Sequence, residues 1–162
     1  MRKVGFTIGK FAPFHRGHQF LIETALEEME EFYIVIYETD IIDVDIKERA
    51  KWIKEIYPSV NIIYAYNSPK QYGLDEESVK IQMEYLFDLI KGIPVTHFYS
   101  SEPYGEKVAQ YLNIENRIVD KERKNVPISS TTIRKDYKKN RKYLEENVYK
   151  SIFSINKKGT HN

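Results

Sequence analysis

The first 119 residues alternate short, β-rich apolar runs with longer amphipathic stretches, and this alternation limits the folds open to the chain. The runs predicted as strands cover residues 4–8, 32–37, 60–65, 95–99 and 116–119. The stretches predicted as helices cover residues 17–31, 47–56, 75–90 and 106–112. This order predicts an α/β fold in which helices cover both faces of a doubly wound parallel sheet.

Beyond Val126 the pattern becomes helical only, with helices predicted over residues 131–138 and 141–150. No linker separates this part from the alternating region. We therefore expect residues 1–156 to form a single domain with a helical C-terminal annex that begins at about residue 129. Residues 157–162 are polar and are expected to form a loose tail.

The composition excludes several classes of protein. Of 162 residues, 41% are hydrophobic and 30% are charged, which is typical of a soluble globular domain. The chain has no cysteine, so disulfides, thiolate nucleophiles and cysteine-based metal sites are excluded, and any metal would be a hard ion on oxygen or phosphate. No apolar run approaches the roughly 18 residues of a membrane span, so no membrane partner and a cytoplasmic location are expected.

Charge is nearly balanced overall, at +1, but it is unevenly distributed. Residues 134–142 contain six basic side chains and one acid, Asp136, whereas residues 23–31 contain five glutamates. The basic run is best explained as a solvated helix face beside an anion site. No nucleic-acid partner is expected, although a salt-sensitive contact with nucleic acid or an acidic protein stays the alternative.

The segment Gly9–His18 lies between the first predicted strand and the first predicted helix. In doubly wound sheets, ligands bind beyond the carboxyl ends of the strands. His15 and His18, three residues apart at the start of a helix, would both face a ligand there, and helix N-termini bind phosphates. Gly9 and Gly17 allow close backbone approach, so the segment predicts an anion cradle.

Two cations could add positive charge to this cradle, namely Lys10 and Arg16. The segment is neither a Walker A loop nor a GxGxxG dinucleotide fingerprint. A zinc site is not predicted either, because His97 has no ligand-type neighbour and the chain has no HExxH sequence.

A second group of polar residues follows the fifth strand. Ser129 or Ser130 would cap the next helix, which alone explains one hydroxyl. The further hydroxyl of Thr131 and the cation of Arg134 extend the group into another set of phosphate ligands. Two such groups in one domain predict a nucleoside triphosphate as ligand.

Both groups match known motifs. Residues 9–18 fit GxFxPxHxGH and residues 128–134 fit ISSTxIR, so the chain resembles the Rossmann-like nucleotidylyltransferases of the HxGH superfamily. It is most similar to the nicotinamide mononucleotide (NMN) adenylyltransferase domain of NadR-type proteins, through residues 9–11, 49–52 and 100–106. The kinase domain and the helix-turn-helix of such proteins have no counterpart in these 162 residues, so we expect neither activity.

The resemblance implies adenylyl transfer from ATP to NMN, which yields NAD and pyrophosphate. It assigns catalysis to His15, His18, Lys10 and Arg134. It assigns ATP binding to Gly9, Lys10, Phe11, His15, His18, Ser129, Ser130, Thr131 and Arg134. Mg²⁺ is expected to arrive with ATP rather than in a protein cage.

Residues of the second helix are expected to bind the acceptor. Trp52 could stack on the nicotinamide ring, or it could fill the core. Arg49 could bind the NMN phosphate, or it could form a surface ion pair with Asp45 or Glu48.

Three residues after the fourth strand complete the expected nucleotide pocket: Ser101, Glu102 and Tyr104. A carboxylate there could accept a hydrogen bond from a ribose hydroxyl. Tyr104 could equally pack beneath its loop.

Other functions stay open at this point. Phosphopantetheine adenylyltransferases and cytidylyltransferases share the fold, but they usually carry an aspartate where this chain has Pro13. A nucleotide-binding protein without catalysis is a further alternative, which the presence of His15, His18 and Arg134 argues against. The sequence leaves the oligomeric state open, a homo-oligomer included.

Overall fold

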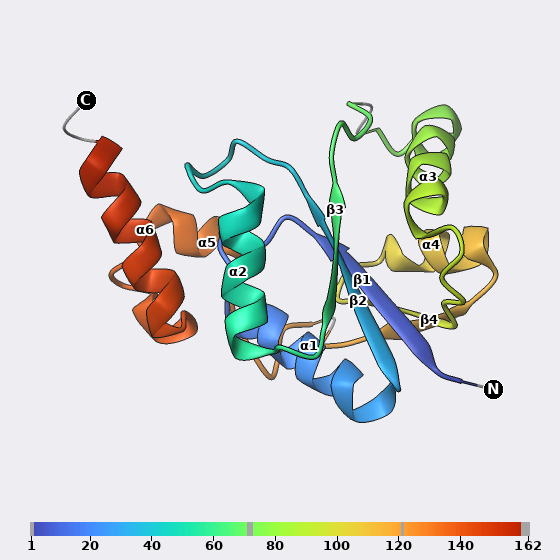
Figure 1. Ribbon diagram of the computed structural model, residues 1–162, viewed down its shortest axis with the longest axis horizontal. Coiled ribbons are helices and arrows are strands. Elements are labelled where there is room, and N and C mark those ends of the chain that lie inside the picture. Colours follow the sequence, from blue (N-terminus) through green and yellow to red (C-terminus); the bar gives the residue numbers. More distant parts are fainter. Residues whose placement is uncertain (1, 71–72, 121, 160–162) are drawn as a thin grey trace.

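Five parallel strands form one sheet at the centre of the molecule, in the order β3-β2-β1-β4-β5 (Figure 1). The computed structural model describes residues 2–70, 73–120 and 122–159, and side chains as far as residue 154. The strands are β1 (Val4–Gly9), β2 (Glu31–Tyr37), β3 (Asn61–Ala65), β4 (His97–Ser100) and β5 (Glu115–Ile118). The predicted doubly wound parallel sheet is therefore confirmed.

Helices cover both faces of this sheet (Figure 1). They are α1 (Arg16–Glu28), α2 (Ile46–Ile56), α3 (Glu76–Ile90), α4 (Gly105–Leu112), α5 (Ser130–Lys135) and α6 (Glu146–Gly159), with a short 3₁₀ helix η1 (Arg141–Tyr143). One core joins α1 and α2 to the annex of α5, η1 and α6. A second core lies beneath α3 and α4 on the opposite face.

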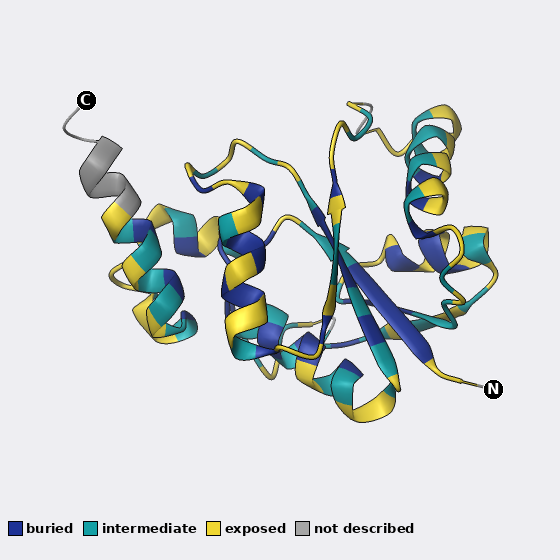
Figure 2. Cartoon of the chain, in the orientation of Figure 1, coloured by how far each residue is buried: buried dark blue, intermediate teal, exposed yellow. Residues whose placement is uncertain are grey.

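The side chains of β2 show how one strand supplies both cores. Phe32, Ile34 and Ile36 belong to the core beneath α1 and α2, whereas Val35 belongs to the core beneath α3 and α4. Successive residues of a strand point to opposite faces, so a continuous apolar run is needed where both faces are covered. Figure 2 accordingly shows buried residues concentrated along the central strands.

The sheet opens where its strand order reverses, between β1 and β4. The β1–β2 ladder continues to Gly9, but β1 pairs with β4 only at Gly5 and Phe6. Beyond that point, the Thr7 hydroxyl donates to the Tyr99 carbonyl at 2.7 Å instead. The loops after β1 and β4 therefore part at the carboxyl edge of the sheet, where doubly wound folds bind ligands.

The predicted helix over residues 17–31 was too long, because α1 ends at Glu28 and Glu31 already begins β2. The predicted helix over residues 131–138 was also too long, since Asp136 adopts an extended backbone after α5. Both errors fall at polar helix ends, where apolar spacing gives no boundary signal.

The predicted helix over residues 141–150 is confirmed only for residues 146–150, which belong to α6, because residues 141–143 form η1 instead. Leu144 has an extended backbone between η1 and α6, and its side chain is buried in the core. The helical pattern therefore breaks where Leu144 packs inward. The tail was predicted to begin at residue 157, but the backbone of α6 continues to Gly159. Residues 160–162 of the predicted tail lie outside the described residues.

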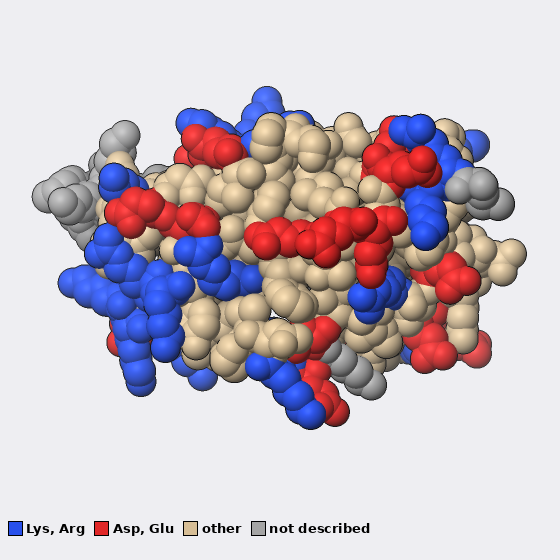
Figure 3. All heavy atoms as spheres, turned by 90° about the horizontal axis from the view of Figure 1, so that it is seen from below, with Lys and Arg blue, Asp and Glu red and all other residues tan. Residues whose placement is uncertain are grey.

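Charge is segregated on the face of the molecule that carries α1 and the annex. Figure 3 shows Lys and Arg gathered at the annex end and a band of Asp and Glu across the middle. Within the basic run at residues 134–142, the exposed basic residues are Lys135, Lys138, Lys139, Arg141 and Lys142. In the part of the chain that is described, no helix combines the length and apolar character needed to cross a bilayer.

Candidate active site

The first turn of α1 is capped by two histidines that hold each other. His15 is the N-cap residue, and its Nδ1 accepts a hydrogen bond from the Gly17 main-chain nitrogen at 3.0 Å. His18 Nδ1 accepts from the His15 main-chain nitrogen at 3.1 Å. The imidazole rings stack with their centroids 3.8 Å apart. This reciprocal capping box fixes both rings, and the HxGH spacing is what produces it.

Both imidazoles are neutral. Burial, together with the charge of Arg123, lowers the pKa of His15 to about 3. Burial lowers the pKa of His18 well below its usual value, with further contributions from His15 and Arg123. Since each Nδ1 accepts a main-chain N–H, each ring proton lies on Nε2. The pair therefore presents two uncharged Nε2–H donors.

Aromatic rings enclose His18 and leave part of it accessible. Phe11 and Phe14 lie against the ring, with centroid distances of 4.7 and 5.9 Å. His15 covers a further side, at 4% exposure of its own. The remaining surface of His18 lines two adjoining pockets, so this residue is at their junction.

The loop that follows β1 is held by two arginines. Phe11 has a left-handed backbone (φ 51°), which a non-glycine residue adopts only when its surroundings enforce it. On one side of Phe11, Arg49 donates to the Lys10 carbonyl. On the other side, Arg134 donates to the Ala12 carbonyl at 2.7 Å. The strained loop is therefore fixed by side chains from α2 and α5.

The start of α5 supplies hydroxyls opposite the histidines. Ser129 is the N-cap residue, and its Oγ accepts from the Thr132 main-chain nitrogen at 3.2 Å. Arg134 donates to the Thr131 hydroxyl at 3.3 Å. Ser129 is therefore the serine that caps the helix. Ser130 lies beside Pro13, and the Ser130 Oγ is 3.5 Å from the Pro13 carbonyl oxygen.

Two pockets, of about 610 and 290 Å³, meet at the carboxyl edge of the sheet. Of the expected residues, twelve line one or both pockets: Gly9, Lys10, Phe11, His15, His18, Ser101, Glu102, Tyr104, Ser129, Ser130, Thr131 and Arg134. The shared wall includes His18, Glu102 and Ser130. Burial raises the pKa of Tyr104 to about 12, so its phenol is neutral and can donate a hydrogen bond.

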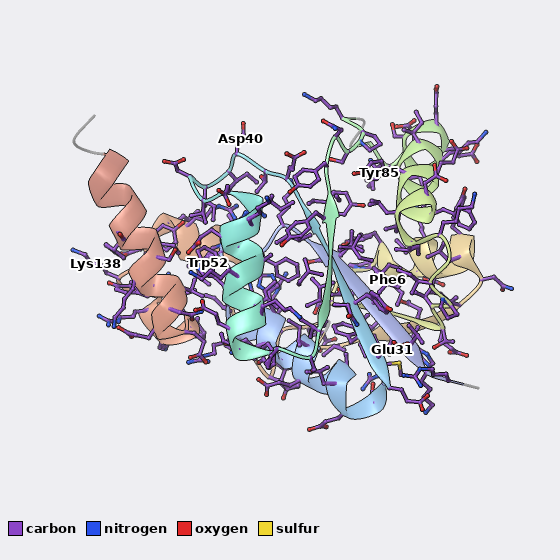
Figure 4. All side chains as sticks on the ribbon, in the orientation of Figure 1. Phe6, Glu31, Asp40, Trp52, Tyr85 and Lys138 are labelled. Carbon is purple, nitrogen blue, oxygen red and sulfur yellow. The ribbon has the colours of Figure 1, made fainter. Side chains whose placement is uncertain are left out.

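The expectation that Trp52 stacks on a ligand was wrong. Its side chain is 1% exposed and belongs to the core beneath α1 and α2. Figure 4 shows it on the side of α2 that faces α6. Its Nε1 is buried without a hydrogen-bond partner, and the residue lines neither pocket. Trp52 is core, as the alternative allowed.

The structure also contradicts both expectations for Arg49. The side chain is 1% exposed, so it is not part of a surface ion pair, and it lines neither pocket. Its Nε donates to the Val44 carbonyl at 3.0 Å, and one terminal nitrogen donates to the carbonyls of Tyr37, at 3.0 Å, and Lys10. Arg49 therefore fastens the ends of β1 and β2 together instead of presenting its guanidinium to a phosphate.

Arg16 likewise does not add charge to the cradle. Its guanidinium pairs with Glu145 and donates to the Gln19 side chain at 2.9 Å. Neither pocket has Arg16 in its wall.

Sequence reasoning missed Arg123. It lines the smaller pocket, donating to the Ile128 carbonyl at 2.8 Å and to Glu102 at 3.1 Å. Left-handed backbones at Asp120 and Arg123 produce the turn that places it there. Without glycines at these positions, the sequence carries no signal for such a turn.

Tyr37 and Tyr85 were also missed. Both line the larger pocket, with ring centroids 6.2 Å apart, and burial raises the pKa of each. In Figure 4 Tyr85 reaches from α3 toward the strands. The position of Tyr37 at the carboxyl end of β2 was a usable signal, because that edge carries the site.

No group of three or more His, Cys, Asp or Glu side chains that could hold a metal ion occurs among the described residues. Among the described residues, two carboxylates line the pockets: Glu102 is paired with Arg123, and Asp120 accepts from the main-chain nitrogens of Asn125 and Val126. The donor set around the pockets instead consists of N–H and O–H groups and cations, which bind anionic oxygen.

Known proteins resemble this chain in sequence and in fold. The trifunctional NAD biosynthesis/regulator protein NadR of Salmonella typhimurium is 29% identical over 154 residues, which cover 83% of this chain and 37% of that protein. The chain thus spans little more than a third of this relative.

Solved structures share the fold. A NadR protein in complex with NAD and AMP-PNP has a TM-score of 0.65 at 20% identity, covering 91% of this chain and 46% of that one. A bifunctional NMN adenylyltransferase/ADP ribose pyrophosphatase from Francisella tularensis, complexed with AMP and a Mn ion, has a TM-score of 0.55 at 18% identity. That match covers 74% of this chain and 37% of the Francisella chain.

Residues 6–136 match the cytidylyltransferase-like family, a span that contains the sheet except for the first two residues of β1, together with both sequence motifs at residues 9–18 and 128–134. The resemblance to NadR-type nucleotidylyltransferases is thereby confirmed. The chain belongs to the cytidylyltransferase-like family and is a nucleotidyltransferase.

Proposed function

We propose that the chain transfers the adenylyl group of ATP to the phosphate of NMN, forming NAD and pyrophosphate. The observation that carries this proposal is the position of His18, which lines both pockets with a neutral Nε2–H donor. A donor nucleotide in one pocket and an acceptor in the other would meet at this ring.

In this proposal the smaller pocket takes ATP. His15 and His18 donate to the α-phosphate, while Ser129, Ser130 and Thr131 bind the β- and γ-phosphates. Arg134 balances the charge of the departing pyrophosphate. Ser101, Glu102 and Tyr104 contact the nucleoside.

ATP enters as its Mg²⁺ complex in this proposal. Magnesium is commonly held by substrate phosphates and water with few protein ligands, which suits a site without a carboxylate cluster among its described residues. The metal neutralises phosphate charge when bound. The hydroxyl and cationic side chains of this chain then bind and orient the phosphate oxygens.

The larger pocket takes the acceptor. Tyr37, Tyr85 and Tyr104 give it aromatic walls that suit a flat, cationic pyridinium ring. Lys10, which lines the larger pocket just after β1, favours the acceptor's phosphate. The ring-stacking role once expected of Trp52 thus passes to these tyrosines.

The reaction requires alignment rather than a base. A phosphate oxygen of NMN attacks the α-phosphorus of ATP, the bond from that phosphorus to the bridging oxygen of the β-phosphate breaks, and pyrophosphate leaves. The attacking phosphate is already ionised near neutral pH. His15 and His18 stabilise the charge that gathers on the α-phosphoryl oxygens, while the fixed loop holds the reactants in line.

An acceptor panel tests the proposal. Pyrophosphate release is measured with ATP and, separately, NMN, nicotinate mononucleotide, phosphopantetheine or glycerol phosphate, and then with CTP as donor. We expect release with ATP and NMN, and a Tyr85→Ala variant, altered in the larger pocket alone, with a KM for NMN raised about tenfold. Turnover with a different acceptor or with CTP would retain the fold and refute the substrate assignment. Nucleotide binding without turnover would indicate a non-catalytic binding protein.

A further inference from the structure

Arg16 lies between the two histidines in sequence, yet its side chain leaves the site for the other end of the chain. Its guanidinium pairs with Glu145, across a separation of 129 residues. The same nitrogen donates to the Gln19 side-chain oxygen at 2.9 Å. The first turn of α1 is therefore tied to the segment just before α6.

Gln19 extends this contact into a hydrogen-bond network. Its side chain is almost completely buried, and its amide donates to Glu145 at 3.1 Å and to the Tyr57 hydroxyl at 3.3 Å. Its main-chain nitrogen donates to the His15 carbonyl at 3.1 Å. A hydrogen-bonded path thus joins Glu145 to His15 through one buried residue.

Glu145 is itself firmly placed. Its carbonyl accepts from the main-chain nitrogens of Val148 and Tyr149, each at 3.1 Å, at the start of α6. Val148 is completely buried in the core, which anchors that helix. Hydrogen bonds from Gln19 and Arg16 lower the pKa of Glu145, so its carboxylate is charged at neutral pH.

The capping box fixes the imidazoles relative to their own helical turn, but it does not fix that turn relative to the annex. The annex carries Ser129, Ser130, Thr131 and Arg134, the other half of the phosphate site. We propose that Glu145 is a positioning residue, which through Arg16 and Gln19 sets the placement of the first turn of α1 relative to α5. The proposal rests on the nucleotidyl transfer described above, but not on the identity of the acceptor.

Kinetics with ATP and NMN provide the first test. Glu145→Ala is expected to lower kcat about tenfold and to change the KM for either substrate less than about twofold, because the histidines act in the transition state. Glu145→Gln, which retains an acceptor oxygen, is expected to recover most of the lost rate. It is also the variant to use if Glu145→Ala fails to fold.

Glu28 offers a matched control at the opposite end of α1. It accepts from Arg117 at 3.1 Å and from the Tyr99 hydroxyl at 2.7 Å, so it too joins an ion pair to a buried partner. Glu28→Ala should lower Tm and leave kcat unchanged. An equal loss of Tm in both alanine variants with kcat retained in both would overturn the proposal and leave Glu145 a stabilising contact.

Imidazole ¹⁵N NMR supplies a readout that needs no turnover. In the wild type, His15 and His18 should show Nε2–H tautomers, with His97 as an internal reference outside both pockets. We expect shifted His15 and His18 signals on titration with AMP-PNP, and smaller shifts in Glu145→Ala. Identical shifts in both proteins would refute the positioning role, even if the wild type were inactive with NMN.

Discussion

Two polar helix starts face each other across the site, and they differ in character. The start of α1 offers two enclosed, uncharged imidazoles that are locked in a capping box. The start of α5 offers the half-buried hydroxyls of two serines, the exposed hydroxyl of Thr131 and the half-buried guanidinium of Arg134, and only Ser129 is committed to capping. From this difference we infer two roles. The start of α1, which is rigid and buried, stabilises the transition state. The start of α5, which is more accessible and charged, binds the phosphates that leave.

The reason lies in desolvation. A neutral N–H donor can be buried at little cost and then acts in a low-dielectric site, where a hydrogen bond to developing charge is strong. A cation needs solvent or a partner, so Arg134 keeps its carbonyl and hydroxyl partners at the edge of the site. Histidines at the α1 start and an arginine at the α5 start therefore follow from their surroundings.

The largest effect is expected at the buried start. His18→Ala should lower kcat by about 10²-fold or more, with little change in the KM for ATP, since it removes a transition-state donor. Steady-state pyrophosphate release measures this change. His97→Ala, which removes a histidine outside both pockets, should leave kcat unchanged. A raised KM for ATP with an unchanged kcat would instead show that the start of α1 binds the ground-state phosphates.

A smaller effect of the opposite kind is expected at the exposed start. Arg134→Met should raise the KM for ATP about tenfold or more and lower kcat less, because it removes a phosphate contact and frees the Ala12 carbonyl. Lys135→Met, at the next position of the same helix, is the matched control and should change neither constant. If kcat fell at constant KM, Arg134 would act on the transition state instead.

Gly17 tests how tightly the histidine pair is held. A Cβ at this position would meet His15 Cε1 at 2.8 Å and Nδ1 at 3.0 Å, so the ring must move. Gly17→Ala should therefore lower kcat about tenfold, although alanine favours the helix. Circular dichroism with steady-state kinetics measures both changes, and an unchanged kcat would mean that the ring position is unimportant.

The neutral histidines also predict how stability depends on pH. Their pKa values are lowered in the folded protein, so below about pH 6.5 the unfolded chain binds protons that the folded chain does not. Stability should fall as the pH drops from 6.5 toward 4.5, by up to about 1.4 kcal/mol per ring and pH unit. Urea unfolding of the wild type and His18→Asn measures this slope, which should be shallower in the variant. Equal slopes would contradict burial of a neutral His18.

The sequence was sufficient for those parts of the site that lie in one continuous segment. The two histidines, the hydroxyls of residues 129–131 and Arg134 each follow a strand or open a helix, and all of them line the pockets. The parallel sheet was predictable for a similar reason, since apolar alternation is local.

Residues whose place depends on distant segments were not predictable. Arg49 is held by the carbonyls of Lys10, Tyr37 and Val44, and a helical pattern cannot distinguish such a buried arginine from a surface one. Trp52 is covered by the annex, whose packing no spacing rule specifies. Arg123 depends on left-handed residues that carry no glycine signal.

The most direct test of the central claim is a ³¹P NMR spectrum of the protein incubated with Mg·ATP and NMN. Attack at the α-phosphorus predicts equal amounts of inorganic pyrophosphate and of the diphosphate of NAD, with the ATP signals falling in step. Formation of ADP and inorganic phosphate with NMN unchanged would contradict adenylyl transfer.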